Sequence, residues 1–589
     1  MHSVSCRVTL LDDPFTEEEI KNAINHMPTD KAPGPDGFTG AFLKSCWDII
    51  KGDFMAAASS FHALRCNSLQ IVNSANIVLI PKKDGAVEVS DYRPISLVHS
   101  FTKVITKALA LRLQPLMKDI ISTSQSAFVK KRSIHDSFLS VRNTARRLHK
   151  TRMPSLFLKL DITKAFDSVR WNYLLILLQR LGFSNRWRDM IAFLLSTSSS
   201  RVLLNGVPIQ PIHHGRGLRQ GDPLSPLLFV IAFDPLQRLL KLATEMEIFS
   251  KMRGRTPGIR ISMYADDAAL FLAPSKEEVS ALSKLLNFFG EASGLKTNFH
   301  KSTVVPIRCS GLNIEDTLSD LSAQKSHFPI KYLGLPLTTY RLRRVDFQPL
   351  VDKAAAKLNG WSGRQLNHAG RMVLVKSVLT SQAIYLLTAL RSPKATLKDI
   401  DAKRKQFLWS GNERLTGGKC KVNWTRTARS KKNGGLGILH LGKFARALRL
   451  RWLWREWFAE DKPWIGDDLP CNVRDELLFA AATAIQIGNG SKIKFWTNAW
   501  LQGLRPLEVA PSIFKISRRK NRTLREALSG NVWIRDINLQ NPSCWLAIQN
   551  RVWTADRLST RGWPHNPVCV LCRRSPESGL HLFVDCRFA

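Results

Sequence analysis

Apolar and polar positions alternate with regular periods along the first third of the chain. Residues 16–27 combine a capping-box pattern with one apolar helical face, which predicts a short helix. The apolar run at 75–81 predicts a strand, and the basic turn at 82–85 leads into a second run at 91–97. These two runs are therefore expected to form a hairpin that carries cations.

Two further strand patterns end at acidic residues. In the segment 155–161 leucines alternate with other residues, which predicts a half-buried strand with Asp161 near its end. Residues 258–272 predict two short strands around a tight turn that holds Asp266 and Asp267. Adjacent central strands would bring the three carboxylates together, although Asp161 precedes the other two by about 100 positions.

Helical patterns surround and follow these strands. Residues 217–240 predict a loop rich in Gly and Pro and then a buried helix whose N-terminus favours anions. A capping pattern at Ser275 and Glu278 predicts another helix. Beyond residue 340 the chain becomes helical and rich in tryptophan. Core packing rather than base stacking is expected for four of these side chains, Trp409, Trp452, Trp454 and Trp457.

The charge of the chain narrows the choice of partner. Its 589 residues contain 87 Lys and Arg against 47 Asp and Glu, a formal net charge of +40. Residues 391–460 alone hold 18 basic and 5 acidic side chains. A polyanion is the expected partner, with scattered solubility charge as the alternative. Nucleic acid is favoured over an anionic membrane because no amphipathic basic anchor stands out.

Cysteine usage and the lengths of apolar runs bear on location. Three of the ten cysteines lie within the last 21 residues and the others are spread thinly, which argues against a disulfide framework. The N-terminus lacks a cationic segment followed by an apolar one, and apolar runs such as 227–233 are too short to span a bilayer. We therefore predict an intracellular protein with no membrane contact.

Three carboxylates that meet at strand ends suit nucleotidyl transfer. In that reaction one metal ion activates the attacking 3′ hydroxyl and a second steadies the leaving pyrophosphate, at a separation of about 3.5–4 Å. Asp161, Asp266 and Asp267 would hold both ions, which predicts two catalytic Mg²⁺. The alternative for Asp266 and Asp267 alone is a solvated turn.

Three ordered motifs resemble those of reverse transcriptases, namely LKLDITKAFDSV at 158–169, GLRQGDPLSPLLF at 217–229 and MYADDAALF at 263–271. Other segments narrow the resemblance to LINE-type, non-LTR retrotransposons, and within these to the plant branch. They are KAPGPDG at 31–37, DYRPISL at 91–97, QSAFVKKRSIHDSF at 125–138, SGLKTNFHKS at 293–302 and KYLGLPL at 331–337. Downstream patterns such as LNGWSGRQLNHAGRMVLVKSVL and KKNGGLGI extend the resemblance over nearly the whole chain.

The resemblance implies roles for individual residues. Asp161, Asp266 and Asp267 are implied to bind the metal ions, with Asp267 less directly ligated. Phe166 resembles the aromatic steric gate that leaves no room for a 2′ hydroxyl, with ordinary core packing as the alternative. Lys301 matches a position that protonates the departing pyrophosphate.

Four more residues are expected to face the incoming nucleotide. Gln220 and Gly221 would lie against nucleotide and template, where the glycine allows a close backbone approach, and a simple buried turn is the alternative. Arg93 and Lys82 are candidates for neutralising the triphosphate, with solvated surface charges as the alternative. Lys131 stands where relatives often place glycine, and it is expected to alter a local turn.

The last three cysteines and one histidine form a metal-binding pattern. The spacing C-x2-C-x8-H-x4-C suits a closed tetrahedral Zn²⁺ site, with reduced thiols beside a surface histidine as the alternative. The segment WTADRLSTRGWPHNPVCVLC at 553–572 resembles the zinc-binding module of plant elements, and nucleic-acid contact by this module is implied by that resemblance. The four expected zinc ligands are Cys569, Cys572, His581 and Cys586.

The resemblance predicts an α+β fold, a right-hand polymerase of fingers, palm and thumb that is followed by a basic helical connector and a small zinc-binding module. The chain ends three residues after Cys586 whereas relatives continue, so the last module is expected to be truncated. The expected domains are an N-terminal helical fingers extension at 1–70, fingers and palm at 71–340, thumb and basic connector at 341–460, a linker region at 461–522, and the zinc-binding domain at 523–589.

The predicted function is RNA-directed DNA synthesis from dNTPs, with an RNA template and a DNA 3′ end as primer. Relatives of this type prime from nicked chromosomal DNA, which implies a nuclear location. No endonuclease or ribonuclease H segment is recognised, so target nicking is expected to come from elsewhere. An RNA-dependent RNA polymerase or an intron maturase shares this chemistry, but Phe166 argues against ribonucleotides and the Cys/His cluster against a maturase. A catalytically silent nucleic-acid-binding remnant of a retrotransposon is the remaining alternative.

Overall fold

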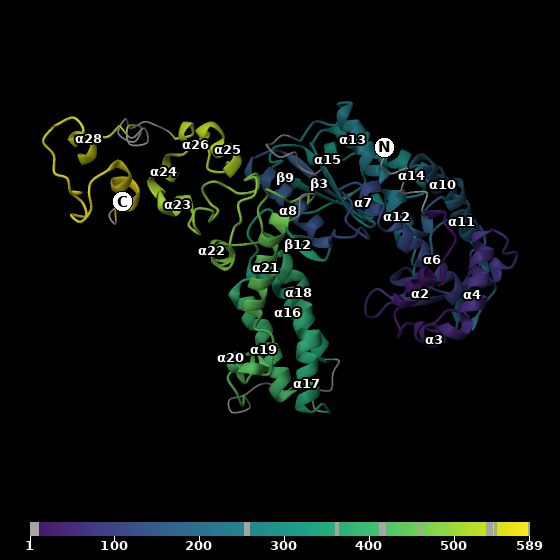
Figure 1. Cartoon of the computed structure of the whole chain (residues 1–589). Helices are drawn as coiled ribbons and strands as arrows, with labels where there is room; N and C mark the ends of the chain where they lie inside the picture. The colour runs from purple at the N-terminus through teal and green to yellow at the C-terminus, as the bar shows by residue number, and fades with distance from the viewer. Residues whose placement is uncertain are drawn as a thin grey trace. The chain divides into compact units, whose positions relative to one another are not determined.

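The computed structural model describes residues 11–252, 260–359, 365–411, 420–458, 462–537, 546 and 551–586. The chain divides into two compact units (Figure 1). The first comprises Met1–Leu441 and Asp461–Leu469, and the second comprises Gly442–Glu460 and Pro470–Ala589. Each unit is described by itself.

A five-stranded sheet of the first unit has the strand order β10-β9-β3-β8-β7. Two of its strands, β3 and β9, are labelled in Figure 1. Strand β3 is central and pairs antiparallel with both β8 and β9, while β10 pairs parallel with β9. The predicted strands at 155–161 and 258–272 are thereby confirmed in type. The strands are β3 (Ser155–Leu160), β7 (Ile261–Tyr264), β8 (Asp267–Leu272), β9 (Thr303–Ile307) and β10 (Gln324–Lys325).

Strand β3 is buried on both faces, so the prediction of a half-buried strand is wrong. The leucines of its alternating pattern lie on one face, in a large core to which α12 (Ser225–Phe233) and α14 (Lys276–Ser293) contribute. On the opposite face the Phe157 ring contacts the rings of Phe271 and Tyr332, at centroid distances of 5.3 and 6.3 Å. Residues distant in the chain, such as Tyr332, cover the second face of β3, and the alternating pattern in the sequence does not reveal this cover.

The segment 217–240 forms a loop and two helices rather than a loop and one helix. These are α12 (Ser225–Phe233), which is almost wholly buried, and α13 (Pro235–Glu245), with Asp234 at the junction. The backbone N–H groups of Leu224 and Ser225 donate to the Asp222 carboxylate at 2.9 and 3.4 Å. The expected anion-binding helix terminus is thus filled by the chain's own Asp222, which corrects that prediction.

The predicted hairpin at 75–97 is confirmed, and it belongs to a second sheet with order β2-β1-β4-β5. Strand β4 pairs parallel with β1, and β6 pairs with β4. These strands are β1 (Ser74–Pro81), β2 (Tyr92–Val98), β4 (Ser199–Leu204), β5 (Val207–Pro208) and β6 (Ile212–His213).

Capping predictions hold for two helices of the first unit. Thr16 caps α2 (Glu17–Asn25), and Ser275 caps α14 (Lys276–Ser293), each by accepting a hydrogen bond from the backbone three residues on. The remaining helices before residue 320 are α3 (Gly40–Ser45), α4 (Trp47–His62), α5 (Leu69–Val72), η2 (Val89–Asp91), α6 (Ser100–Leu113), α7 (Met117–Ile120), α8 (Ile134–Lys150), α9 (Ala165–Ser168), α10 (Trp171–Arg180), α11 (Asn185–Ser196), η3 (Phe299–Lys301) and α15 (Ile314–Thr317).

A helical region follows the small β11–β12 hairpin, as the sequence predicted. Within it α16 packs against α18 and α19, and the buried guanidinium of Arg404 on α19 donates to Thr380 of α18 at 3.0 Å. The elements are β11 (Ile330–Tyr332), β12 (Leu335–Leu337), η4 (Arg344–Phe347), α16 (Gln348–Asn359), α17 (His368–Leu374), the π-helix η5 (Val375–Leu379), α18 (Thr380–Ala389), α19 (Lys394–Ser410), α20 (Trp424–Thr427) and η6 (Lys431–Asn433).

One helical stretch among the described residues, His368–Ala389, is long and apolar enough to cross a membrane by length and composition alone. Its mean hydropathy is 1.5 and 44% of it is buried inside the protein. Core helices of soluble proteins meet the same criterion, so this is weak evidence for a membrane span, and the expectation of no membrane contact stays a prediction.

Residues 462–469 belong to the first unit, where they contact helix α8. The indole Nε1 of the buried Trp464 donates to the Asp136 carboxylate at 2.8 Å, and Lys462 Nζ reaches the same carboxylate at 2.9 Å. A buried carboxylate with two such donors is well compensated.

The second unit contains short helices around an aromatic core at 485–533. The expected core packing of tryptophans holds for Trp452 and Trp457 in this unit and for Trp409 in the first. It is wrong for Trp454, which is 53% exposed. The helices are α21 (Leu441–Phe458), α22 (Val473–Ala482), α23 (Pro506–Val509), α24 (Pro511–Ile516), α25 (Leu524–Leu528), η7 (Ser529–Asn531), α26 (Val532–Arg535), α28 (Ala555–Ser559) and the π-helix η8 (His581–Asp585).

Candidate active site and metal-binding cluster

The register of the central sheet aligns two of the predicted site residues. Leu160 pairs with Ala268 of β8, so Asp161, the next residue, lies opposite Asp267. On its other side β3 pairs with β9, and Lys301 ends the 3-10 helix η3 just before β9. The charge of Lys301 lowers the pKa of Asp161. Cross-strand neighbours have Cβ atoms about 4.5–5.5 Å apart and share one face of the sheet. Strand pairing therefore fixes Asp161 beside Asp267, and these two residues with Asp266 are called the carboxylate row.

Asp266 occupies the turn between β7 and β8. Tyr264 pairs with Asp267, so Ala265 and Asp266 form the two-residue connection, in which Ala265 has a φ of +54°. Such tight hairpins favour left-handed central residues because these match the twist of the strands. The turn brings the Asp266 carboxylate close to Asp161, and the charge of Asp266 raises the pKa of Asp161.

The carboxylates perturb one another. Burial raises the pKa of Asp161, the Asp266 charge raises it further, and Lys301, Lys159 and Lys82 oppose the rise. Burial also raises the pKa of Asp267, and the other two carboxylates add to the effect. Like charges held together disfavour the ionised forms. A cation among these oxygens would remove that penalty.

Lys159 is a site residue that the sequence reasoning missed. It precedes Asp161 by two positions on β3 and so shares its face of the sheet. Its charge lowers the pKa of both Asp161 and Asp267, and its Nζ lies 3.5 Å from the Lys331 carbonyl. The signal was present in the sequence, since a lysine interrupts an otherwise apolar strand.

Gln125 is a second residue that was missed. It is fully buried, and its carboxamide donates to the Ala265 carbonyl at 3.3 Å and accepts from the Ala265 N–H at 3.1 Å. Ser126 N–H also donates to the Met263 carbonyl at 3.1 Å. The segment around Gln125 therefore holds the acidic turn from outside the hairpin.

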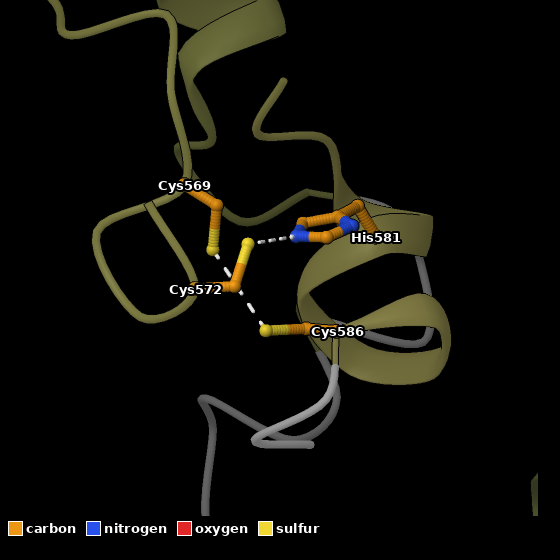
Figure 2. A group of neighbouring side chains, drawn as sticks. All are labelled: Cys569, Cys572, His581 and Cys586. Carbon is orange, nitrogen blue, oxygen red and sulfur yellow. Dashed lines mark hydrogen bonds between the residues drawn. The ribbon is translucent and has the colours of Figure 1, made fainter. Parts of the chain in front are cut away.

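The predicted zinc ligands converge in the second unit. The ligand atoms of Cys569, Cys572, His581 and Cys586 all lie within 4.8 Å of one another (Figure 2). Cys569 Sγ lies 3.9 Å from Cys586 Sγ, and Cys572 Sγ lies 3.2 Å from His581 Nε2. Tetrahedral Zn²⁺ with Zn–S bonds of about 2.3 Å separates its sulfur ligands by about 3.8 Å. The donor set and its spacing fit zinc.

The turn that carries the first two cysteines favours the thiolate. Backbone N–H groups of Arg574 and Ser575, with His581, lower the pKa of Cys572 to about 6. Arg573, with φ +52°, turns the chain so that its N–H donates to the Cys569 carbonyl at 2.8 Å. Thiolates are the form that binds metal.

Comparison with known families assigns the first of these sites. Residues 80–337, which contain Asp161, Asp266, Asp267 and Lys301, match the family model described as reverse transcriptase (RNA-dependent DNA polymerase). This segment is a reverse transcriptase domain. Residues 510–589, which contain the Cys/His cluster, match the model described as zinc-binding in reverse transcriptase.

Several curated relatives that match most of the chain are named as proteins of mobile elements. A Transposon TX1 protein of Xenopus laevis is 28% identical over 77% of this chain and 34% of its own length. The Pol polyprotein of the retrotransposable element R2DM from Drosophila melanogaster is 27% identical over 74% of this chain and 40% of its own length. The R2 Pol polyprotein of Nasonia vitripennis is 24% identical over 97% and 53%. The chain thus spans between a third and about half of these relatives.

The resemblance to non-LTR retrotransposon reverse transcriptases is therefore confirmed, while the plant branch stays a prediction. Among solved structures, a telomerase from Candida albicans is similar with a TM-score of 0.33 and 14% identity, covering 64% of this chain and 61% of that one. This likeness is too distant to add to the argument.

In the reverse transcriptase domain Phe166 lies just beyond Asp161 with its ring partly exposed. It stacks on the Phe229 ring at a centroid distance of 4.4 Å. The short helix α9, which carries Phe166, packs against Gly217. The Gly217 N–H donates to the Val169 carbonyl at 2.8 Å, and a Cβ at this position would lie 2.6 Å from the Asp167 carbonyl oxygen. Phe166 is thus packed on one side and open on another, so core packing and a sugar contact are compatible.

Gln220 and Gly221 lie against strand β2 of the domain. The Ser96 N–H donates to the Gln220 carbonyl at 2.7 Å. Gly221 has a φ of +113°, and a Cβ there would meet the Ser96 carbonyl oxygen at 2.6 Å. The close approach expected of Gly221 is therefore to the protein's own backbone, and only glycine fits.

Lys82 and Arg93 share one face of the β1–β2 hairpin. Arg93 pairs with Ile80, and Lys82 follows Ile80 by two positions, with its N–H donating to the Asp91 carbonyl at 2.8 Å. Both side chains are exposed. The charge of Lys82 lowers the pKa of Asp161, so this lysine is electrostatically coupled to the carboxylate row.

Proposed function

We propose that this chain is the polymerase part of a non-LTR retrotransposon and copies RNA into DNA from dNTPs. The observation that carries the proposal is the strand register, which holds Asp161 and Asp267 side by side with Asp266 in the adjoining turn. Three carboxylates at the end of a central sheet suit nucleotidyl transfer. Activity, substrates and partners are proposed for the chain because it spans only part of its relatives.

Two Mg²⁺ ions are proposed to bind to Asp161, Asp266 and Asp267. Carboxylate oxygens are the ligands that this cation prefers, and Mg²⁺ retains waters that an open site accommodates. Asp161 and Asp266 are exposed and Asp267 is partly buried, so the set fits such an ion. When bound, the metal pair activates the 3′ hydroxyl and stabilises the leaving pyrophosphate.

The protein's own residues are proposed to orient the nucleotide. Lys301, at the end of η3 and electrostatically coupled to Asp161, is proposed to donate a proton to the departing pyrophosphate. Lys82 and Arg93 are proposed to contact the triphosphate, Lys82 as a point charge and Arg93 through paired hydrogen bonds. Phe166 is proposed to exclude the 2′ hydroxyl, with Gln220 and Gly221 beside the nucleotide and template.

RNA template and DNA primer are the proposed macromolecular partners. The formal charge of +40 supports binding to a phosphate backbone, and such binding weakens as salt rises. Zn²⁺ is proposed as a structural ion of the Cys569–Cys586 cluster. Because chromosomal DNA would supply the primer, we also propose that the protein acts in the nucleus.

The test is magnesium-dependent dNTP incorporation on a primed RNA template. The Asp266→Ala/Asp267→Ala variant removes two of the three carboxylates, and Asp189→Ala, an exposed carboxylate on α11, is the matched control. Extension by wild type and control that falls to background in the double variant is the expected result. Extension with NTPs in place of dNTPs would instead favour an RNA polymerase.

The silent binding protein predicts a different outcome. Wild type, control and double variant would then all fail to extend the primer while still binding the template with equal affinity. Binding assays on the same preparations therefore separate the two functions, since a folded but inactive chain retains its salt-dependent affinity for RNA.

A further inference from the structure

Two tryptophans of the second unit stack on each other at the protein surface. The rings of Trp553 and Trp563 lie 5.0 Å apart between centroids at an interplanar angle of 30°. They are 51% and 50% exposed, whereas Trp452 and Trp464 are fully buried. Tryptophan buries a large area when it packs in a core. A pair with half of its surface open is not explained by core packing.

The local backbone holds this pair in a defined geometry. Helix α28 follows Trp553 directly, and the chain reverses after it through Gly562, with a φ of +68°. The Trp563 N–H donates to the Leu558 carbonyl at 3.0 Å, which returns the second indole to the first. The Arg561 guanidinium lies 4.6 Å from the Trp553 ring centroid, so a cation accompanies the aromatic pair.

Glu577 connects the pair to the metal-binding turn. Its carboxylate accepts from Ala555 N–H at 3.3 Å, at the start of α28, and from Val570 N–H at 3.4 Å, between the first two cysteines. The Asp556 N–H also donates to the Glu577 carbonyl at 3.2 Å. The tryptophan pair is therefore built on the framework that the Cys/His cluster closes.

The surroundings of the pair favour a polyanionic occupant with flat rings. Residues 551–577 carry five arginines against two acidic side chains, Asp556 and Glu577. Aromatic faces beside arginines bind single strands because every base stacks on them whatever its identity, while the cations follow the phosphates. An apolar protein partner would offer no negative charge to the excess arginines, so a polyanion fits this surface better.

We propose that Trp553, Trp563 and Arg561 form a stacking platform for unpaired bases of single-stranded RNA or DNA. The proposal rests on the proposed function to the extent that a reverse transcriptase handles such strands at its template and target. It adds a binding site in the zinc-binding module, distinct from the carboxylate row of the first unit.

The test uses the full-length, zinc-loaded chain and fluorescent single strands of about 20 nucleotides, as RNA and as DNA. Each strand is compared with an abasic strand of the same length, which keeps the phosphates and removes the rings. The Trp553→Leu/Trp563→Leu variant retains apolar bulk without an aromatic face, and Trp553→Phe/Trp563→Phe restores one. Trp454→Ala, an equally exposed tryptophan outside the module, is the matched control.

Wild type is expected to prefer the strand with bases over the abasic strand by about tenfold or more. The Leu variant should lose this preference while its affinity for the abasic strand and its salt dependence stay unchanged, since the phosphate contacts remain. The Phe variant and the Trp454→Ala control should keep the preference. Comparison of the RNA and DNA arms identifies which strand the platform takes.

Two results would overturn the proposal. One is a Leu variant that keeps the preference for bases, and the other is a wild type that shows none. Equal loss of affinity for both strands in the Leu variant would mean that the module has unfolded, which the measured zinc content would also show. The Phe variant then decides whether an aromatic ring at these two positions is needed for the preference for bases. Primer extension on a pre-annealed template is measured in parallel, so that failure of catalysis and failure of the platform are seen separately.

Discussion

The Gln125 carboxamide binds both backbone polar groups of Ala265, although the two residues are 140 positions apart. Gln125 Oε1 also accepts from the Ala127 N–H at 2.9 Å, which fixes the orientation of the amide. Ala265 has a φ of +54°, a conformation that an L-residue adopts only where the surroundings hold it. The position of the neighbouring Asp266 thus depends on a side chain from outside the hairpin.

Replacement of Gln125 by Ala is expected to slow dNTP incorporation by about tenfold or more, because small displacements of positioned groups are costly to catalysis. Loss of a buried partner should also lower stability by about 1–3 kcal/mol. Single-turnover extension should detect the first effect as a lower rate with little change in dNTP affinity, and thermal unfolding should detect the second.

Two further variants sharpen this test. Gln125→Glu can accept from Ala265 N–H but cannot donate to the Ala265 carbonyl when ionised, and it adds charge beside the acidic turn, so it should lose at least as much activity as Gln125→Ala. Gln179→Ala, on the exposed side of α10, should match wild type. Full activity of both Gln125 variants would contradict the positioning role.

The sequence predicted most of this site because its parts are local. Strand patterns located Asp161 and the turn of Asp266 and Asp267, and the resemblance ordered them. Strand register, which no local pattern contains, placed Asp161 beside Asp267 and revealed Lys159 on the same face. The register follows from long-range pairing between β3, β8 and β9, which periodicity alone leaves open.

The errors have the same physical origin. The burial of both faces of β3 depends on Tyr332, which comes from a hairpin far along the chain. The N-terminus of α12 looked free for an anion because the sequence does not reveal that Asp222 folds back onto it. Trp454 was expected in the core because composition does not distinguish the buried side of a helix from its exposed side. In each case tertiary contacts determined what local pattern could not.

Replacement of Lys131 by Gly is expected to stabilise the first unit. Lys131 has a φ of +69°, and relief of this strain should outweigh the entropy that glycine adds to the unfolded chain, for a gain of about 1 kcal/mol or less. The main-chain carbonyl that accepts from Lys462 is retained. Thermal unfolding followed by circular dichroism measures the gain.

The adjacent Lys130 provides the matched control for this prediction. It is also exposed but its φ is negative, so Lys130→Gly should lower stability by about 0.5–1 kcal/mol. Opposite signs for the two neighbouring substitutions would establish that conformation, not charge, sets the effect. Equal effects would contradict the strain argument.

Replacement of Asp36 by Asn is expected to destabilise the protein in a pH-dependent manner. Burial alone would raise the pKa of Asp36, but hydrogen bonds from His99 and Ser100 lower it to about 2, below its ordinary value of 3.8. The Ser100 N–H, at the start of α6, donates to this carboxylate at 2.7 Å. A capping carboxylate of this kind contributes about 1 kcal/mol.

The sign of the pH effect follows from the lowered pKa. The ionised carboxylate stabilises the fold above pH 3.8. This contribution is lost as the pH falls toward 2, because Asp36 then becomes protonated in the folded protein as well as in the unfolded chain. The difference in urea midpoint between wild type and Asp36→Asn should therefore be smaller at pH 3 than at pH 5. A difference that stays unchanged down to pH 3 would refute this account.

Replacement of Phe166 by Ala is expected to relax the choice of sugar. If the ring excludes the 2′ hydroxyl, its removal should raise the ratio of kcat/KM for NTPs to that for dNTPs by about tenfold or more. Phe166→Tyr keeps the ring and its stack on Phe229, and it should discriminate as wild type does. If Phe166→Ala lowered activity with both nucleotides equally, the ring would be a packing residue only.

Removal of zinc is expected to unfold the module at 551–586 and to leave the reverse transcriptase domain active. The buried cluster of this module among the described residues consists of Cys569, Cys572 and Cys586, while Val570 and Leu571 between the first two are exposed. So small an apolar core does not sustain a fold, and metal binding then supplies the free energy. Cys586→Ser should therefore reduce the bound zinc from about one ion per chain to none.

Limited proteolysis measures the consequence for the fold. Cleavage within 551–586 should become fast in Cys586→Ser and in chelator-treated wild type, whereas Cys420→Ser, an exposed cysteine outside the module, should behave as untreated wild type. Extension of a short pre-annealed primer–template should persist, because the carboxylate row belongs to the other compact unit. A protease-resistant module without zinc would mean that the four side chains are reduced thiols beside a histidine, as the alternative reading of the sequence holds.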